Sequence, residues 1–240
     1  MALKIIVSYD DSDNDRDALA LGRLLAFSGA ELSLAYVRHS FGESLDQHAS
    51  EELLARGAES VGTPDMPKYV VINPATSIGL AEVAEQEHAD VIVFGSEYRT
   101  ANGLVKPGIS AHKLLLGGGS AIAVAPAGLR SNPALSVNTV GVIDEGDPAA
   151  RSTAEGLAAA LGATVAEHGS GPLDFLVVGS RKEAPEGKVV LSAASDYAVE
   201  AANYPVLVIP RGGVLNFAGA PAATVDDPAP TATDPAPTTA

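Results

Sequence analysis

The chain has 240 residues, no cysteine, no tryptophan and a formal net charge of −15. The missing cysteines exclude disulfides, thiolate metal sites and a cysteine nucleophile, and the negative charge argues against nucleic acid or an anionic membrane as a partner. Hydrophobic residues make up 46% of the chain and aromatic residues only 5%, which favours the Val, Ile, Leu and Ala core of a parallel sheet covered by helices.

The first part of the chain, residues 1 to about 128, alternates predicted strands with predicted helices. Short apolar runs bounded by turn residues predict buried strands, and apolar residues at spacings of three and four predict helices between them. Such alternation is typical of a doubly wound, Rossmann-like α/β domain with right-handed crossovers. The predicted strands are 4–9, 31–37, 68–72, 91–94 and 122–124, and the predicted helices are 18–25, 43–60 (with Leu45, Leu53 and Leu54 on one side), 78–87 and 111–116.

The second part, from about 137 to 212, repeats this alternation in a shorter form. Its second helix and third strand are missing, so we predict a truncated Rossmann-like domain in tandem with the first. The remaining residues, 213–240, are rich in Pro, Ala and Thr, with three Asp and no Lys or Arg. We predict a disordered tail, because such a segment buries too little apolar surface to become ordered. The predicted elements of the second domain are strands 140–143, 164–166, one beginning at Phe175 and 206–209, with a helix at 149–161.

One stretch occurs in both domains, first as 89–96 and then as 173–180. In each copy an acidic residue leads into a four-residue apolar run that stops at Gly-Ser, and a second apolar run follows and stops at proline. An internal repeat of this size predicts two related domains. Each final strand is an apolar edge that invites a partner strand. We therefore expect the two final strands to pair in an internal pseudo-dimer, while a homodimer of two chains stays open.

The sequence also predicts where in the cell the protein is located. No apolar run approaches the roughly 20 residues that cross a membrane as a helix, and no charged-then-apolar signal segment precedes the first strand. We therefore expect a cytoplasmic protein with no membrane or nucleic acid among its partners.

Three segments of the first domain resemble the universal stress protein family. The resemblance covers most of residues 3–126 and, more loosely, 137–210. It implies tandem Rossmann-like domains and a regulatory role in the stress response. The three segments are Val7-Ser8-Tyr9-Asp10-Asp11-Ser12 with Ala18-Leu19, then Pro74-Ala75 with Ile78 and the 89–96 stretch, and finally the Gly-rich loop with the last strand.

ATP-binding members of this family carry the motif G-x-x-G-x9-G-[ST] after the fourth strand. Glycines let the backbone approach phosphates, and the N–H groups at the start of the following helix attract an anion. Gly95 and Gly108 match this motif, but Tyr98 replaces the second glycine and Ile109 replaces the hydroxyl residue, for which Ser110 is a substitute. A lost hydrogen bond to a charged partner costs about 1.5–3 kcal/mol. We therefore expect weak binding of ATP or another adenine nucleotide at most.

The resemblance implies further that Asp10, at the carboxyl edge of the sheet, contacts the adenosine part of a nucleotide. An equally good interpretation is that Asp10 caps the next helix. We interpret Asp144 as its counterpart in the second domain, where Gly179, Lys182, Ser192 and Ala193 keep the spacing of the motif but match it at one position. The full set of residues expected at a nucleotide is Asp10, Val37, Gly95, Gly108, Ile109 and Ser110.

Other candidate sites are weaker. The acidic cluster between Asp10 and Asp17 lacks the spaced ligands and glycine of a calcium loop, and the five histidines show no metal spacing, so we expect no metal. No nucleophile is paired with a base, so we expect a binding protein rather than an enzyme. The alternatives are a structural or interaction module that binds no nucleotide, and an adenine-nucleotide hydrolase, which would need the intact phosphate loop that this chain lacks.

Overall fold

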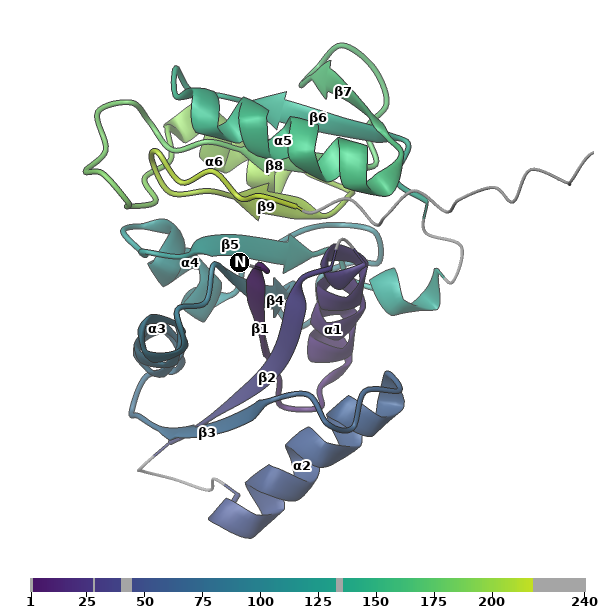
Figure 1. Ribbon diagram of the computed structural model, residues 1–240, viewed down its shortest axis with the longest axis vertical. Helices are drawn as coiled ribbons and strands as arrows, with labels where there is room; N and C mark the ends of the chain where they lie inside the picture. Colours follow the sequence, from purple (N-terminus) through teal and green to yellow (C-terminus); the bar gives the residue numbers. More distant parts are fainter. Residues whose placement is uncertain (1, 28, 40–44, 133–135, 218–240) are drawn as a thin grey trace, which may run out of the picture.

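The computed structural model describes residues 2–27, 29–39, 45–132 and 136–217. Its described strands form one nine-stranded sheet in the order β3-β2-β1-β4-β5-β9-β8-β6-β7 (Figure 1). All neighbours run parallel except β5 and β9. The predicted α/β fold class is therefore confirmed. The strands are β1 Lys4–Ser8, β2 Glu31–Arg38, β3 Lys68–Ile72, β4 Val91–Gly95, β5 Ala121–Ala125, β6 Thr139–Ile143, β7 Thr164–Glu167, β8 Phe175–Val178 and β9 Val206–Val208.

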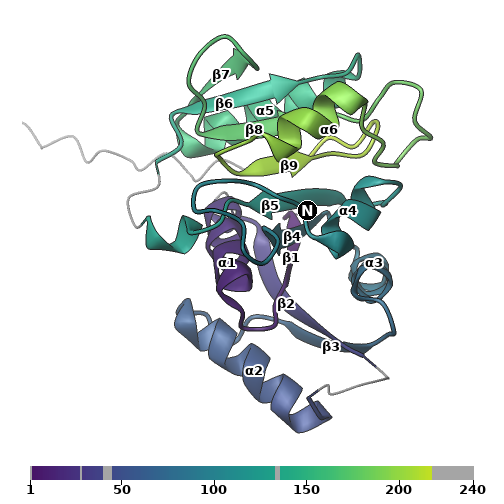
Figure 2. The ribbon, with the colours of Figure 1, turned by 180° about the vertical axis from the view of Figure 1, so that it is seen from behind.

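Helices cover both faces of the sheet (Figures 1 and 2). Their buried side chains fall into two apolar clusters, one on each face. Helices α1, α2 and α5 pack in the first cluster, and α3, α4 and α6 pack in the second. No helix among the described residues is long and apolar enough to cross a bilayer. The helices are α1 Asp13–Ala26, α2 Gln47–Ser60, α3 Thr76–Glu87, α4 Ile109–Leu115, α5 Pro148–Leu161 and α6 Ala193–Glu200, with a short 3₁₀ turn at Leu129–Ser131.

The start of α2 differs from the prediction. Asp46 is the N-cap and accepts a hydrogen bond from the Ala49 N–H, so the helix begins after Leu45. Leu45 is exposed and lies outside the helix, whereas Leu53 and Leu54 are buried as predicted. The side-chain cap makes the helix begin later than the apolar spacing suggested. The start of the predicted helix, at 43 and 44, lies outside the described residues.

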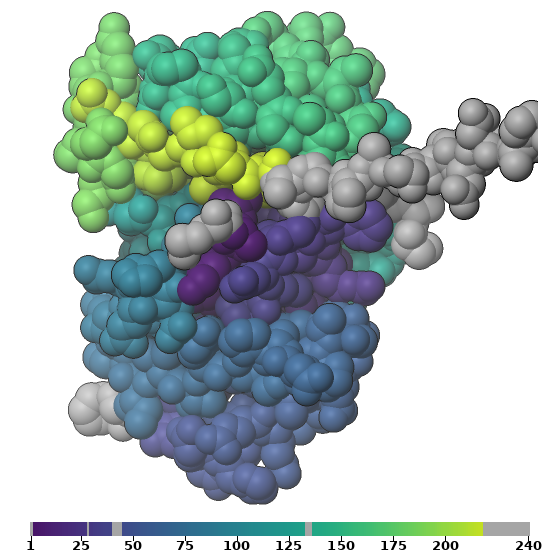
Figure 3. All heavy atoms as spheres, in the orientation of Figure 1, coloured from purple at the N-terminus to yellow at the C-terminus, as the bar shows by residue number. Residues whose placement is uncertain are grey.

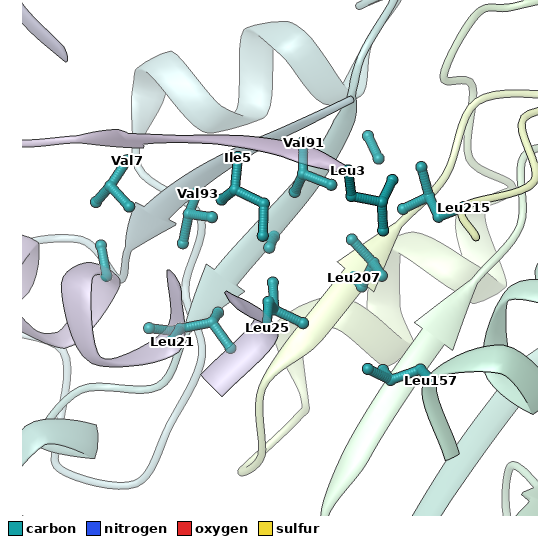
Figure 4. Packing of buried hydrophobic residues seen from close by; sticks show 14 of the residues in the cluster. Leu3, Ile5, Val7, Leu21, Leu25, Val91, Val93, Leu157, Leu207 and Leu215 are labelled. Carbon is teal, nitrogen blue, oxygen red and sulfur yellow. The ribbon is translucent and has the colours of Figure 1, made fainter. Parts of the chain in front are cut away.

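The predicted pairing of the two final strands is confirmed. Strand β5 pairs with β9 in the antiparallel direction, with Ala123 opposite Leu207 at the centre. The sheet is therefore continuous across the two parts of the chain, here called the first half (β1–β5) and the second half (β6–β9). The apolar core is continuous too, because Leu207 and Leu215 belong to the same buried cluster as Leu3 (Figure 4).

The second half lacks more than was predicted. Strand β7 is followed by β8 after only residues 168–174, so α2, β3 and also α3 have no counterpart. The remaining elements correspond in order. Strand β6 takes the place of β1, β8 that of β4, α6 that of α4, and β9 that of β5.

The prediction of a disordered tail from residue 213 is wrong for its first residues. Leu215 and Phe217 are only 6% and 8% exposed, and the Leu215 N–H donates to Thr153 Oγ1 of α5 at 3.0 Å. This segment, the last of the yellow residues in Figure 3, packs on the α5 face of the sheet. Two apolar residues on alternate positions were enough to anchor it. The rest of the predicted tail, 218–240, lies outside the described residues.

Candidate functional site

The carboxyl ends of β1 and β2 carry a small cavity of about 160 Å³. Asp10 and Val37 line it together, as expected for two residues of one site. The other four expected residues do not line it, because they belong to the end of β4 and the start of α4. The lining residues are Ser8, Tyr9, Asp10, Asp15, Ala35, Tyr36, Val37, His39 and Thr76.

Asp10 stabilises the turn that starts α1. Its Oδ1 accepts a hydrogen bond from the Ser12 N–H at 2.8 Å, and its own N–H donates to Asp15 Oδ2 at 2.7 Å. The N-cap itself is Ser12, whose Oγ accepts from the Asp15 N–H at 3.2 Å. The cap interpretation of Asp10 is therefore right about the region and wrong about the residue. Asp10 is exposed and faces the cavity as well, so the turn does not exclude a ligand contact.

The two carboxyl groups of this turn have opposite pKa shifts. Burial and the adjacent Asp10 carboxyl raise the pKa of Asp15 well above its ordinary value. Partial desolvation of the Asp10 carboxyl at the cavity raises its pKa, but the hydrogen bonds from Asp15 and Ser12 outweigh this effect, and the Asp10 pKa is lowered overall. Two carboxyl groups this close cannot both ionise freely. The cavity therefore presents the Asp10 carboxylate beside an Asp15 carboxyl that keeps its proton to a higher pH.

Gly95 has a packing role that the motif did not suggest. A Cβ at this position would lie 2.0 Å from the backbone oxygen of Asn14, so only glycine lets the first turn of α1 approach the end of β4. Gly108 is different, because an added Cβ there would meet nothing within 4 Å. Of the two glycines that match the phosphate motif, only Gly108 has open space beside it.

The start of α4 is exposed and has no side-chain cap. Gly108 is the N-cap residue and supplies no hydroxyl or carboxylate, so the first N–H groups of the helix lack the usual side-chain acceptor. Tyr98 and Ile109 are each 76% exposed. Their side chains therefore extend into solvent, and the Tyr98 ring lies 5.2 Å from the Arg99 guanidinium carbon. The left-handed backbone that a glycine would favour occurs at Arg99, with φ of 71°.

A pair of serines at the ends of β4 and β8 holds the loops of the site, a role that was not predicted from the sequence. Ser96 Oγ donates to the Ala125 carbonyl at 2.7 Å and accepts from the Lys106 N–H at 3.1 Å. Ser180 Oγ donates to the Ile209 carbonyl at 2.7 Å, and the Val190 N–H donates to Ser180 Oγ at 3.2 Å. The Gly-Ser dipeptide that ends the apolar run in both copies of the repeat was the sequence signal that could have identified these two serines.

The interpretation of Asp144 as the counterpart of Asp10 is wrong. Ile5 pairs with Val91 in β4, and Val140 pairs with the matching residue Phe175 in β8. This register aligns Tyr9 with Asp144 and Asp10 with Glu145. The N-caps agree, since Ser12 caps α1 and Asp147 caps α5. The prediction erred by one residue because the first half stays extended through Tyr9, whose N–H bonds the Ala35 carbonyl.

Glu145, the counterpart of Asp10, is bonded to the start of α6. Its Oε1 accepts hydrogen bonds from Ser192 Oγ and Ser195 Oγ. In the repeat, Ser192 takes the place of Gly108 and Ser195 that of Ala111. The carboxylate therefore lies at the start of α6, where a helix favours an anion. The loop after β6, through Glu145, and the start of α6, through its two serines, are therefore hydrogen-bonded to each other.

Among the described residues, no group of three or more His, Asp or Glu side chains is placed to hold a metal ion.

The chain resembles known proteins in its structure. No protein-family model matches the chain, and no curated protein matches it. A universal stress protein from Archaeoglobus fulgidus DSM 4304 superposes with a TM-score of 0.57 at 16% identity, over 87% of this chain and 98% of that one. The chain has the universal stress protein fold.

Two further structures agree. A putative universal stress protein from Pseudomonas aeruginosa UCBPP-PA14 has a TM-score of 0.59 at 13% identity, over 87% of this chain and 93% of that one. A protein of unknown function from Pseudomonas aeruginosa PAO1 has a TM-score of 0.60 at 14% identity, over 88% and 93%. The resemblance inferred from the sequence is thus confirmed for the fold, and the superposition extends over both halves.

Proposed function

We propose that this chain is a regulatory protein of the universal stress protein type that acts in the cytoplasm and binds an adenine nucleotide weakly in its first half. The observation that carries this proposal is the contrast between the two helix starts. In the first half the start of α4 is uncapped and exposed. In the second half the start of α6 holds the chain's own Glu145 carboxylate.

The residues of the first half fit the two ends of a nucleotide unequally. Asp10 and Val37 line the cavity at the adenosine end, where the Asp10 carboxylate can accept hydrogen bonds from ribose hydroxyls. The N–H groups of Ile109 and Ser110 offer donors to phosphate oxygens. The cavity holds only about 160 Å³, below the ~300 Å³ typical of small-molecule sites. The proposed affinity is therefore low, and the proposed role is binding rather than catalysis.

One observation favours the alternative of an interaction module that binds no nucleotide. Tyr98 and Ile109 are large side chains, each 76% exposed, at the loop and helix start where the phosphates would lie. Exposed apolar and aromatic side chains also serve protein contacts. This alternative predicts no saturable nucleotide binding in either half.

Equilibrium dialysis with labelled ATP tests the proposal, and a matched pair of variants locates the site. Ile109→Glu places a carboxylate at the exposed start of α4, and Ala193→Glu places one at the same position of α6. Both substitutions leave the helices intact, since an acidic residue in the first turn is favourable. We expect Ile109→Glu to weaken binding about tenfold or more through repulsion of phosphate and Ala193→Glu to have no effect. Absence of saturable binding up to millimolar ATP would favour the interaction module.

A further inference from the structure

The missing helix of the second half leaves an open cleft. Its volume is about 620 Å³, and it lies on the α6 face of the sheet, over the ends of β6 and β7. In the first half the same place, beside α4 and over β2 and β3, is filled by α3. Figure 2 shows this difference: α3 and α4 cover this face of the first half, and α6 alone covers it in the second. The cleft residues are Val142, Ile143, Asp144, Glu145, Glu167, His168, Ala194, Ser195, Tyr197, Ala198, Ala201 and Tyr204.

The wall that α6 presents to the cleft suits a packed helix. Ala194, Ala198 and Ala201 lie at helical spacings of four and three on the cleft side, and small residues in such a row let another helix approach closely. Tyr197 beside them is 73% exposed, and Tyr204 is half-buried at the end of the cleft. In the first half, α3 buries Leu80, Val83 and Ala84 in the equivalent place. The cleft therefore offers an apolar and aromatic surface where the fold already accommodates a helix.

The negative charge of the cleft indicates which kind of partner helix it favours. Three carboxylates line it, from Asp144, Glu145 and Glu167, and no Lys or Arg lines it among the described residues. Arg151 of α5 reaches Asp144 at 3.6 Å and Glu167 at 2.5 Å, which leaves an excess of negative charge. Charge complementarity favours a basic partner and disfavours an acidic one.

We propose that this cleft binds a basic amphipathic helix of another protein, in the place that α3 occupies in the first half. A second copy of the chain is a poor occupant, because each copy carries a net charge of −15. The C-terminal segment is a poor occupant too, because the chain leaves on the α5 face at Phe217 and residues 218–240 contain three Asp and no Lys or Arg. Docking of an amphipathic helix into such a groove is a common mode of recognition. This proposal does not depend on nucleotide binding.

The test uses α3 itself as the probe. A labelled peptide of residues 74–88 is stapled between positions 78 and 82, which are both exposed in α3, since a short helix is unstable alone. One version keeps Glu85 and Glu87, and the other has lysine at both positions. Fluorescence anisotropy with the full chain measures binding. We expect the lysine peptide to bind in the micromolar range and the glutamate peptide at least about tenfold more weakly, with a difference that shrinks in high salt.

A matched pair of variants places the contact. Tyr197→Ala removes an exposed aromatic ring of the cleft, and Phe27→Ala removes a ring that is 78% exposed on the first half. Neither ring is buried, so both variants should fold, and circular dichroism checks this. We expect Tyr197→Ala to weaken binding of the lysine peptide about fivefold or more and Phe27→Ala to leave it unchanged. No binding of the lysine peptide at 1 mM, equal binding of the two peptides, or an equal response of the two variants would overturn the proposal.

Discussion

The two halves share a scaffold but differ at the start of one helix. The serine that fixes each loop makes the same two hydrogen bonds, with Ser96 in one half and Ser180 in the other. The start of α4, by contrast, has a glycine and no cap, while the start of α6 has Ser192 bound to Glu145. A few side chains at one edge of the sheet thus decide whether a helix start is exposed or holds the chain's own carboxylate, and the strands beneath need not change.

The halves differ a second time in what covers the sheet. The first half keeps α2, β3 and α3, and the second connects β7 directly to β8. In the second half, one side chain covers part of the sheet surface that the missing elements leave uncovered. An added Cβ at Gly141 would lie 2.3 Å from Leu173 Cδ1, so the Leu173 side chain covers the strand there. In the first half the corresponding residues are Ile6 and Ala89, with the large and the small residue exchanged.

The largest expected effect tests whether the two strand-end glycines are equivalent. Gly95→Ala places a Cβ 2.0 Å from Asn14 O, and Gly179→Ala places one 2.9 Å from Asp144 O. We expect Gly95→Ala to lower the free energy of unfolding by about 4 kcal/mol and Gly179→Ala by about 1–2 kcal/mol. Urea unfolding measures both. A Gly95→Ala variant that loses nucleotide affinity but not stability would show that the glycine serves the ligand and not the packing.

The start of α6 can be converted to the residues found at the start of α4. Ser192→Gly with Ser195→Ala removes both hydroxyls that bind Glu145. We expect a loss of about 2 kcal/mol in the free energy of unfolding, because two hydrogen bonds to a carboxylate are partly replaced by water. Gly108→Ser alone is the reverse control. It should change stability little, since serine exceeds glycine as an N-cap by only about a few tenths of a kcal/mol, and Asp10 is one methylene shorter than Glu145 and already bonds Ser12. Equal effects in the two halves would contradict the difference between the sites.

Restoring the family motif in the first half should increase the difference in nucleotide affinity between the two halves. Tyr98→Gly removes a large side chain and lets the loop backbone approach a phosphate, and Ile109→Ser returns a hydroxyl at the start of α4. We expect the double variant to bind ATP about tenfold more tightly, equivalent to one good hydrogen bond of ~1.4 kcal/mol. Equilibrium dialysis measures the change, and melting checks that the loop stays folded. A folded double variant with unchanged affinity would favour the interaction module.

The smallest expected effect concerns pH and the acidic turn, which the second half lacks because Ala150 takes the place of Asp15. The raised pKa of Asp15 means that the native state holds this proton more tightly than the unfolded chain. The contribution of Asp15 to the free energy of unfolding therefore falls as the pH rises from about 4 through the raised native pKa. Asp15→Asn should remove that fall and stabilise the protein most at the high end of this range.

Urea unfolding at a series of pH values follows the difference between Asp15→Asn and the native chain. The control is Asp65→Asn, which replaces an exposed carboxylate elsewhere and should leave the pH dependence unchanged. A difference between Asp15→Asn and the native chain that stays constant with pH would show that Asp15 ionises normally.

Most of the fold was readable in the sequence because buried parallel strands are short apolar runs with clear ends. The acidic residues that open the two copies of the repeat show why the copies look alike, since Asp90 accepts from the Lys4 N–H and Asp174 from the Thr139 N–H. The pairing of the final strands followed from two apolar edges. The packing of Leu215 and Phe217 was not predicted, because the prediction for this segment followed its overall content of Pro, Ala and Thr and gave two apolar residues too little weight.

The sequence by itself determined the alternation of strands and helices, the similar stretches at 89–96 and 173–180 and the residues that depart from the phosphate motif. These are local properties, set by periodicity, turn residues and spacing along the chain. Only the tertiary structure decided that Gly95 is fixed by Asn14, that Glu145 and not Asp144 corresponds to Asp10, and that Glu145 bonds to the start of α6. Each of these depends on contacts between strand ends and helix starts far apart in the chain, and a shift of one residue in register changes which side chain meets which partner.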